Sequence, residues 1–181
     1  FNNFLDALIE RKMPLPWGAE LRADVITEQE AFKLQEANCQ LVATGIESAS
    51  KKVLKRNFKF QNPKAVGQGI RRMKKAGLAI QAYFIIGLPG DTREDFQKTL
   101  KFAEALPFEP NRDRINFFMS TPYPGSDIAT HPQKYDLKIA NSTYQKYNCH
   151  EVLIETKHLT NEDLRWMQSK AMEFKEKHHF R

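Results

Sequence analysis

A chain of 181 residues with 41% hydrophobic and 11% aromatic residues can bury one substantial core, which excludes an intrinsically disordered protein. No apolar run approaches the roughly 20 residues that cross a bilayer, and Asp6, Glu10 and Arg11 interrupt the region where a signal peptide would lie, so we expect a cytoplasmic protein without a membrane span. The net charge is +6, but the lysines and arginines are dispersed among glutamates, which favours an ordinary solvated surface.

Helices and strands are predicted to alternate along the first 120 residues. The pattern predicts four strands, near 17–22, 41–47, 79–86 and 114–120. A first helix capped by Asn2 or Asn3 precedes them. The helices between the strands begin at the Thr27–Glu30 capping box, at Ser48 or Ser50, at Asn62–Pro63 (ending at Gly77) and at Thr92. Gly67 and Gly69 lie inside a predicted helix, where each costs about 1 kcal/mol, so we expect close packing against the sheet there.

Strands that alternate with helices form right-handed crossover units around a parallel sheet. The fold class that we predict is α/β, a partial (βα) TIM-like barrel fragment with parallel strands in residues 1–127, followed by a mostly helical C-terminal extension at 128–181. Within that extension, "EVLIET" predicts one more strand and Thr160 begins the last helix. The first element is a helix, although helices follow strands in this pattern, so we expect an upstream strand to be missing. An open sheet edge would then be covered by the missing N-terminal half or by self-association.

Polar or backbone-exposing residues follow each of the four strands at the same end, where parallel α/β folds place their sites. Each of these positions also has a local explanation. Arg22 could pair with Asp24, and Glu47 could cap the next helix or pair with Lys51. The glycines of "GLPG" could serve only the turn, and "TPYPGS" could be a rigid loop. Their recurrence at one edge of the sheet favours a ligand.

Three stretches, "GIESASKKVLKRNFKFQN", "MKKAGLAIQAYFIIGLPGDTREDFQKTLKFAEAL" and "NFFMSTPYPGSDI", resemble the C-terminal part of the radical S-adenosylmethionine core. They are most similar to the group that often carries an upstream cobalamin-binding domain and includes proteins similar to the anaerobic magnesium-protoporphyrin ester cyclase. The resemblance covers roughly residues 1–127.

This resemblance implies a partial barrel of six βα units that binds S-adenosylmethionine. Glu47 matches the position that hydrogen-bonds the ribose, and Lys59 matches a basic residue that contacts the methionyl carboxylate. Arg22 matches a methionyl-contacting position where some relatives have an acid, and Tyr83 stands where some have aspartate. The end of the third strand and Met119 would flank the adenine. The implied cofactor-binding residues are Arg22, Glu47, Ser48, Lys59, Tyr83, Ile85, Gly87 and Met119.

The family holds its [4Fe–4S] cluster through three cysteines spaced C-x-x-x-C-x-x-C, whereas this chain has only Cys39 and Cys149. We therefore expect the cluster ligands to lie in a longer parent protein, and the chain alone to be inactive, with no catalytic or metal-binding residue assigned. The resemblance implies that the parent cleaves S-adenosylmethionine reductively to a 5′-deoxyadenosyl radical that modifies a small-molecule substrate, and cobalamin is a candidate second cofactor.

The alternative function, from another class, is a basic α/β module that binds nucleic acid or a protein partner without enzymatic activity. Its candidate residues are the cationic pairs Lys51–Lys52, Lys55–Arg56 and Arg71–Arg72. Binding of this kind would weaken steeply with salt, because it depends on the neutralisation of phosphate charges. The dispersed charge does not favour it.

Overall fold

A computed structural model describes residues 1–140 and 143–180. Its centre is a four-stranded sheet in the order β1-β2-β3-β4, and every neighbouring pair is parallel. The prediction of four parallel strands with helices between them is confirmed. The strands are β1 (Trp17–Glu20), β2 (Cys39–Glu47), β3 (Ala79–Ile86) and β4 (Arg114–Met119).

The helices that connect these strands begin at the predicted residues in four cases. Side chains of Thr27, Ser50, Asn62 and Thr92 each accept a hydrogen bond from a backbone N–H in the first turn of α2 (Glu28–Glu36), α3 (Lys51–Arg56), α4 (Pro63–Lys75) and α5 (Arg93–Glu104), respectively. The helix α1 (Asn2–Glu10) forms as predicted, but its predicted cap is wrong, because Phe1 occupies the N-cap position and makes no side-chain cap. Asn2 lies within the helix, and its amide reaches Glu30 instead.

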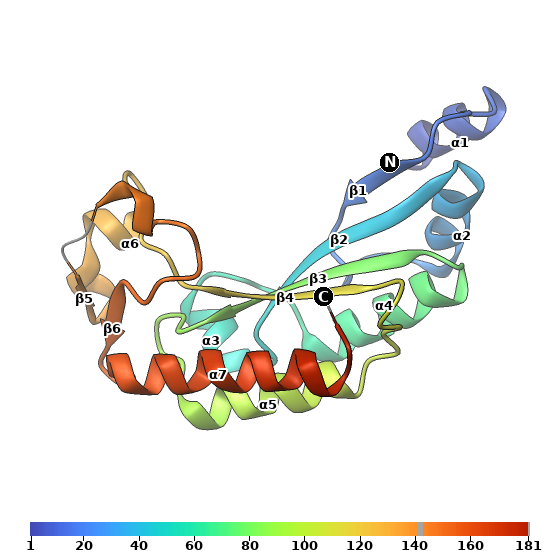
Figure 1. The fold of residues 1–181 in the computed structure, drawn as a ribbon. Coiled ribbons are helices and arrows are strands. Elements are labelled where there is room, and N and C mark those ends of the chain that lie inside the picture. The colour runs from blue at the N-terminus through green and yellow to red at the C-terminus, as the bar shows by residue number, and fades with distance from the viewer. Residues whose placement is uncertain (141–142, 181) are drawn as a thin grey trace.

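The helices α3, α4 and α5 lie on one face of the sheet, the lower face in Figure 1. Leu34 of α2, Ile70 of α4 and Phe84 of β3 are completely buried in the core between the two layers. The long last helix, α7 (Asn161–Lys177), joins the same layer beside α5 and places Phe174 in that core. The opposite face of the sheet is concave and carries the half-buried residues of β2 and β3.

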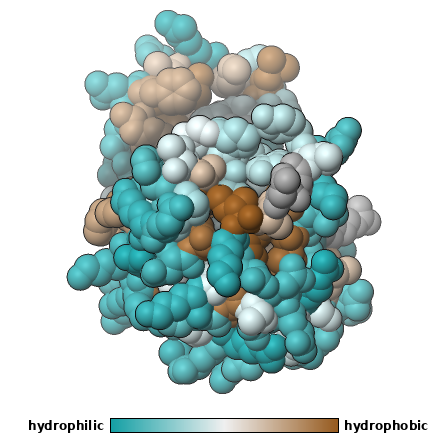
Figure 2. Space-filling view, turned by 90° about the vertical axis from the view of Figure 1, so that its left-hand side faces the viewer, coloured by the Kyte–Doolittle hydropathy of each residue, from teal (hydrophilic) through white to brown (hydrophobic). Residues whose placement is uncertain are grey.

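The C-terminal region between β4 and α7 contains short elements, and the strand predicted from "EVLIET" is confirmed. β5 (Leu137–Ile139) and β6 (Ile154–Thr156) form an antiparallel hairpin over a small cluster of Tyr135, Leu137 and Ile154. Figure 2 views this end of the molecule and shows hydrophobic side chains at its centre among hydrophilic ones, with further hydrophobic side chains near the top. The other short elements are α6 (Asp127–Thr130), η1 (Pro132–Tyr135) and η2 (Tyr144–Lys146). Because α7 returns to the sheet, a domain boundary at residue 127 stays a prediction.

Gly69 shows why α4 contains a glycine. A methyl group built at Gly69 would lie 1.7 Å from the carbonyl oxygen of Ala23, so the helix approaches the segment after β1 and not the sheet itself. Within residues 1–140 and 143–180, no helix is long and apolar enough to cross a membrane.

Candidate functional site

A hollow of about 320 Å³ opens on the concave face, at the carboxyl ends of β2, β3 and β4. Its lining includes four of the eight predicted cofactor-binding residues, namely Glu47, Tyr83, Ile85 and Met119. A fifth, Lys59, is hydrogen-bonded to Glu47. The remaining lining residues are Leu88, Phe118, Ser120, Thr121, Tyr123, Ile128 and Cys149. The hollow thus combines an apolar and aromatic lining with one carboxylate, which is the composition of many small-molecule sites.

Glu47 has an unusual backbone conformation at the end of β2. Its φ is +63°, in the left-handed region, and the pairing with β3 shifts register between Gly45 and Glu47. The side chain accepts a 2.6 Å hydrogen bond from the ammonium of Lys59. Neither local alternative describes Glu47, because Ser50 caps α3 and Lys59, not Lys51, is the ionic partner. A left-handed backbone conformation is uncommon in residues other than glycine, and the residues that adopt it are often found at functional sites.

Gly45 makes room for this ion pair, a role that was not predicted. A methyl group built at Gly45 would lie 2.5 Å from Glu47 Oε1 and 3.1 Å from Lys59 Nζ. The carboxylate and the ammonium therefore fold back over the strand into space that only glycine leaves. The sequence signal was available, since a glycine two residues before a strand-ending acid lies on the same face of the strand.

Gln61 supports the irregular end of β2. The residue is 9% exposed, and its Nε2 donates to the carbonyl oxygens of Gly45 at 3.3 Å and Ile46 at 2.6 Å. Carbonyls at a bulge lose their regular sheet partners, so this amide supplies the missing donors.

Replacing Gln61 with leucine should lower the free energy of unfolding by about 1–3 kcal/mol, because two buried carbonyls lose their donor. Urea denaturation of the variant measures this loss. Gln68→Leu is the matched control, since Gln68 is exposed on α4 and the same exchange there removes no buried hydrogen bond. Equal losses in the two variants would show that Gln61 does not support the bulge.

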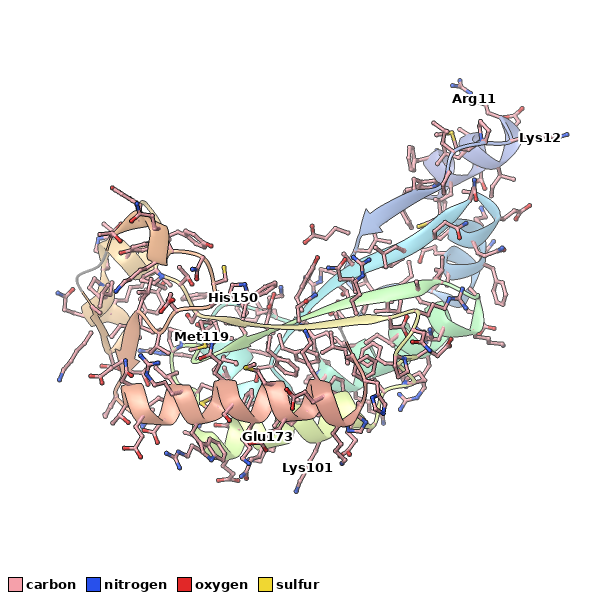
Figure 3. The ribbon with its side chains drawn as sticks, in the orientation of Figure 1. Arg11, Lys12, Lys101, Met119, His150 and Glu173 are labelled. Atoms are coloured by element: carbon pink, nitrogen blue, oxygen red, sulfur yellow. The ribbon has the colours of Figure 1, made fainter. Side chains whose placement is uncertain are left out.

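Tyr83 and Ile85 face the hollow from β3, as strand alternation requires. Tyr83 packs against Phe118 of the neighbouring strand, with ring centroids 5.8 Å apart. Met119 differs from these residues: it is only 3% exposed and packs with Ile86 and Phe96 on the helix side, so little of it borders the hollow. Figure 3 shows Met119 at the carboxyl end of β4, with His150 above it.

Ser48, Gly87 and Arg22 are not brought into the hollow. Ser48 is 2% exposed, and its hydroxyl lies 3.3 Å from Thr99 of α5, on the helix side. Arg22 forms a two-pronged contact with Asp24 at 3.0 and 2.8 Å, the local alternative, and also donates to the Phe60 carbonyl.

The "GLPGD" turn packs against protein on both sides. A methyl group at Gly87 (φ +76°) would lie 2.4 Å from Leu164 Cδ2 of α7, and one at Gly90 would lie 3.3 Å from Arg56 Cγ. These glycines are therefore explained by the close approach of α7 and α3, and not by a ligand near the missing side chains. Asp91 is buried within the turn and accepts from the backbone N–H of Thr92 at 2.9 Å.

The C-terminal region supplies Tyr123, from the "TPYPGS" stretch that favoured a ligand, and Cys149, which the sequence did not indicate as a site residue. The Tyr123 hydroxyl and the Cys149 thiol lie 2.8 Å apart, and this hydrogen bond raises the pKa of Tyr123. The carbonyl of Cys149 accepts from the N–H of Met119, which holds this segment against the end of β4. No local pattern joins positions 26 residues apart, so only the tertiary structure shows the pair.

The two cysteines cannot share a metal cluster. Cys39 begins β2, is 1% exposed and has its thiol pKa raised by burial, whereas Cys149 lies at the opposite, carboxyl end of the strands. Among the residues that the structure places, no group of three His, Cys, Asp or Glu side chains is arranged to hold a metal ion. The residues present therefore do not fit a [4Fe–4S] cluster.

Comparison with known proteins identifies the family. The family model described as the radical SAM superfamily matches residues 6–103, which is more than half of the chain. An uncharacterized methyltransferase from Pyrococcus horikoshii is 32% identical over 164 residues, covering 88% of this chain and 34% of the relative. The anaerobic magnesium-protoporphyrin IX monomethyl ester cyclase of Rubrivivax gelatinosus is 29% identical, covering 82% of this chain and 26% of the relative.

The fold is also that of solved radical SAM structures. Coproporphyrinogen III oxidase from Escherichia coli superimposes with a TM-score of 0.69 at 15% identity, covering 97% of this chain and 36% of the oxidase. This chain thus spans about a quarter to a third of the length of the relatives and the structure that it matches.

Proposed function

Because the chain belongs to the radical SAM superfamily, we propose that the hollow at the carboxyl ends of β2, β3 and β4 binds S-adenosylmethionine. In this proposal the Glu47 carboxylate accepts hydrogen bonds from the ribose hydroxyls, Lys59 contacts the methionyl carboxylate, and Tyr83, Ile85 and Met119 border the adenine. Within the superfamily, bound S-adenosylmethionine supplies a 5′-deoxyadenosyl radical after its reductive cleavage.

The observation that carries the proposal is the Glu47–Lys59 pair in the space left by Gly45. S-adenosylmethionine carries a diol and a carboxylate. A carboxylate is an acceptor without donors, which suits the diol, and an ammonium is a donor without acceptors, which suits the carboxylate. The pair is 16% and 37% exposed at its side chains, so both groups stay accessible while their separation is fixed.

The chain's own residues bind and orient the cofactor in this proposal, and the apolar lining excludes water from it. Tyr83 and Phe118 form an aromatic wall beside Ile85, which suits a flat base, while Tyr123 and Cys149 line the part of the hollow that comes from the C-terminal region. We propose that the substrate, a small molecule, contacts this second part. The [4Fe–4S] cluster would be held by other residues of the full-length protein, and cobalamin stays a candidate there.

Glu47→Ala in the full-length, cluster-containing protein should raise the dissociation constant for S-adenosylmethionine by on the order of tenfold to a hundredfold, measured by calorimetric titration. Hydrogen bonds to a charged acceptor contribute roughly 1.5–3 kcal/mol, which sets this range. Glu47→Gln should lose less affinity, because the amide oxygen still accepts.

Glu20→Gln is the control for this titration, because Glu20 is an exposed residue of β1 outside the hollow and its replacement removes a carboxylate in the same way. Unchanged affinity in Glu47→Ala together with a lowered melting temperature would show that Glu47 only supports the fold.

A further inference from the structure

A second hollow, of about 200 Å³, lies between α3 and the β5–β6 hairpin, and none of its residues lines the proposed cofactor site. Its walls come from three distant parts of the chain. Lys52 and Arg56 belong to α3, Gly90 to the turn after β3, and the rest to the C-terminal region. The residues from the C-terminal region are Tyr135, Asp136, Thr156, Lys157 and His158.

Basic residues outnumber acidic ones around this hollow. The lining residues include Lys52, Arg56, Lys157 and His158, and Asp136 is the one acidic residue among them. Lys157 and His158 are exposed, and among the residues that the structure describes neither forms an ion pair. Repulsion between cations that converge in this way is relieved by an anion.

Arg56 and Lys52 keep donors available despite their partners. One guanidinium nitrogen of Arg56 contacts both the Lys134 carbonyl at 3.0 Å and Asp136 at 3.3 Å. A guanidinium carries five N–H donors, so those on its other nitrogens remain free of these two acceptors. Lys52 lies 3.0 Å from Asp95, but its side chain is 65% exposed and its ammonium has three donors.

Gly90 keeps the hollow open beside Arg56. A methyl group built there would lie 3.3 Å from Arg56 Cγ, so any side chain at this position would press on the arginine stem. The residue has φ +82°, a conformation that glycine adopts without strain.

We propose that this hollow binds a phosphate group, either inorganic phosphate or the terminal group of a phosphomonoester. Basic residues line it from α3 and from the segment before α7. A tetrahedral dianion with several acceptor oxygens can satisfy donors from different directions at once, whereas a carboxylate presents two oxygens in one plane. The volume accommodates the group itself and leaves an open side for a substituent.

The competing explanation is that the basic residues have a structural role, in which the Arg56–Asp136 ion pair holds the hairpin against α3. Lys157 separates the two explanations, because it is a lining residue that takes no part in that pair. Its replacement leaves the attachment of the hairpin intact and removes one cation from the proposed site.

The test is an NMR titration of the protein with sodium phosphate and, separately, with O-phosphoethanolamine, at constant pH and with ionic strength held by sodium chloride. We expect saturable shifts of the Gly90, Lys157 and His158 amides. Lys157→Gln should weaken binding about tenfold, the effect of losing one charge-assisted hydrogen bond. Lys101→Gln should bind as the wild type does, because Lys101 points from α5 into solvent (Figure 3).

Saturation with both probes shows that the phosphate group alone is recognised, and saturation with O-phosphoethanolamine alone assigns the site to a phosphomonoester. Shifts that rise without saturation, or that Lys157→Gln leaves unchanged, would overturn the proposal. Because the cofactor hollow shares no residue with this one, these results are independent of the Glu47 titration.

Discussion

Replacing Asp113 with alanine should lower the free energy of unfolding by about 3–5 kcal/mol, the cost of leaving a buried charge without its partner. Asp113 lies before β4, and its side chain is completely buried. It accepts 2.7 Å hydrogen bonds from the backbone N–H groups of Ile80 and Glu109 and from the ammonium of Lys74. The Lys74 side chain is itself 7% exposed, so among the described residues the variant leaves its ammonium with Glu109 as the one ionic partner.

Urea denaturation measures this effect, with Asp6→Ala as the control. Asp6 pairs with Lys33 at the surface, where its side chain is 53% exposed, so its loss should cost less than about 1 kcal/mol. If Asp113→Ala does not fold, the double variant Asp113→Ala, Lys74→Met should recover stability, because it removes both charges. Equal losses for Asp113→Ala and Asp6→Ala would contradict this account of the buried pair.

Features that depend on local sequence were predictable from residue patterns alone. The capping box at Thr27 and Glu30 satisfies N–H groups within a single turn, so its residue types already determine its structure. The strands were found in the same way, because apolar runs bounded by turn residues are local signals. The cap at Asn2 or Asn3 failed for a related reason: two adjacent cap-forming residues did not fix where α1 begins, and Phe1 precedes both.

The candidate site was only partly predictable, since its geometry depends on contacts between distant residues. Alternation in β4 could have placed Met119 on the helix side with Ile115 and Phe117, but the strand is apolar on both faces and gives no clear signal. The glycines of "GLPG" indicated a close approach correctly, yet the approaching group is Leu164 of α7, about 75 positions further along the chain. A sequence pattern specifies that space is needed, and the tertiary structure specifies what fills it.

Asp91 in the same turn should make stability depend on pH. Burial raises its pKa to about 7 from an ordinary value of 3.8. Between these values the unfolded chain releases a proton that the folded protein keeps. The stability that the protonated group contributes is therefore complete below about pH 4 and is lost as the pH rises through 7. With about 1.4 kcal/mol for each pH unit, the loss between pH 4 and pH 8 is on the order of 3–4 kcal/mol.

Asp91→Asn should remove this dependence, because an amide stays neutral and its oxygen can still accept from the Thr92 N–H. Relative to the wild type, the free energy of unfolding of the variant should rise by about 3–4 kcal/mol between pH 4 and pH 8. Urea denaturation at several pH values measures this change. Glu20→Gln, at an exposed position on β1, should show no such trend. If the difference in free energy of unfolding between Asp91→Asn and the wild type does not change with pH, Asp91 is ionised throughout this range. The two backbone donors of the turn, Thr92 and Gly87, would then hold a carboxylate despite its burial.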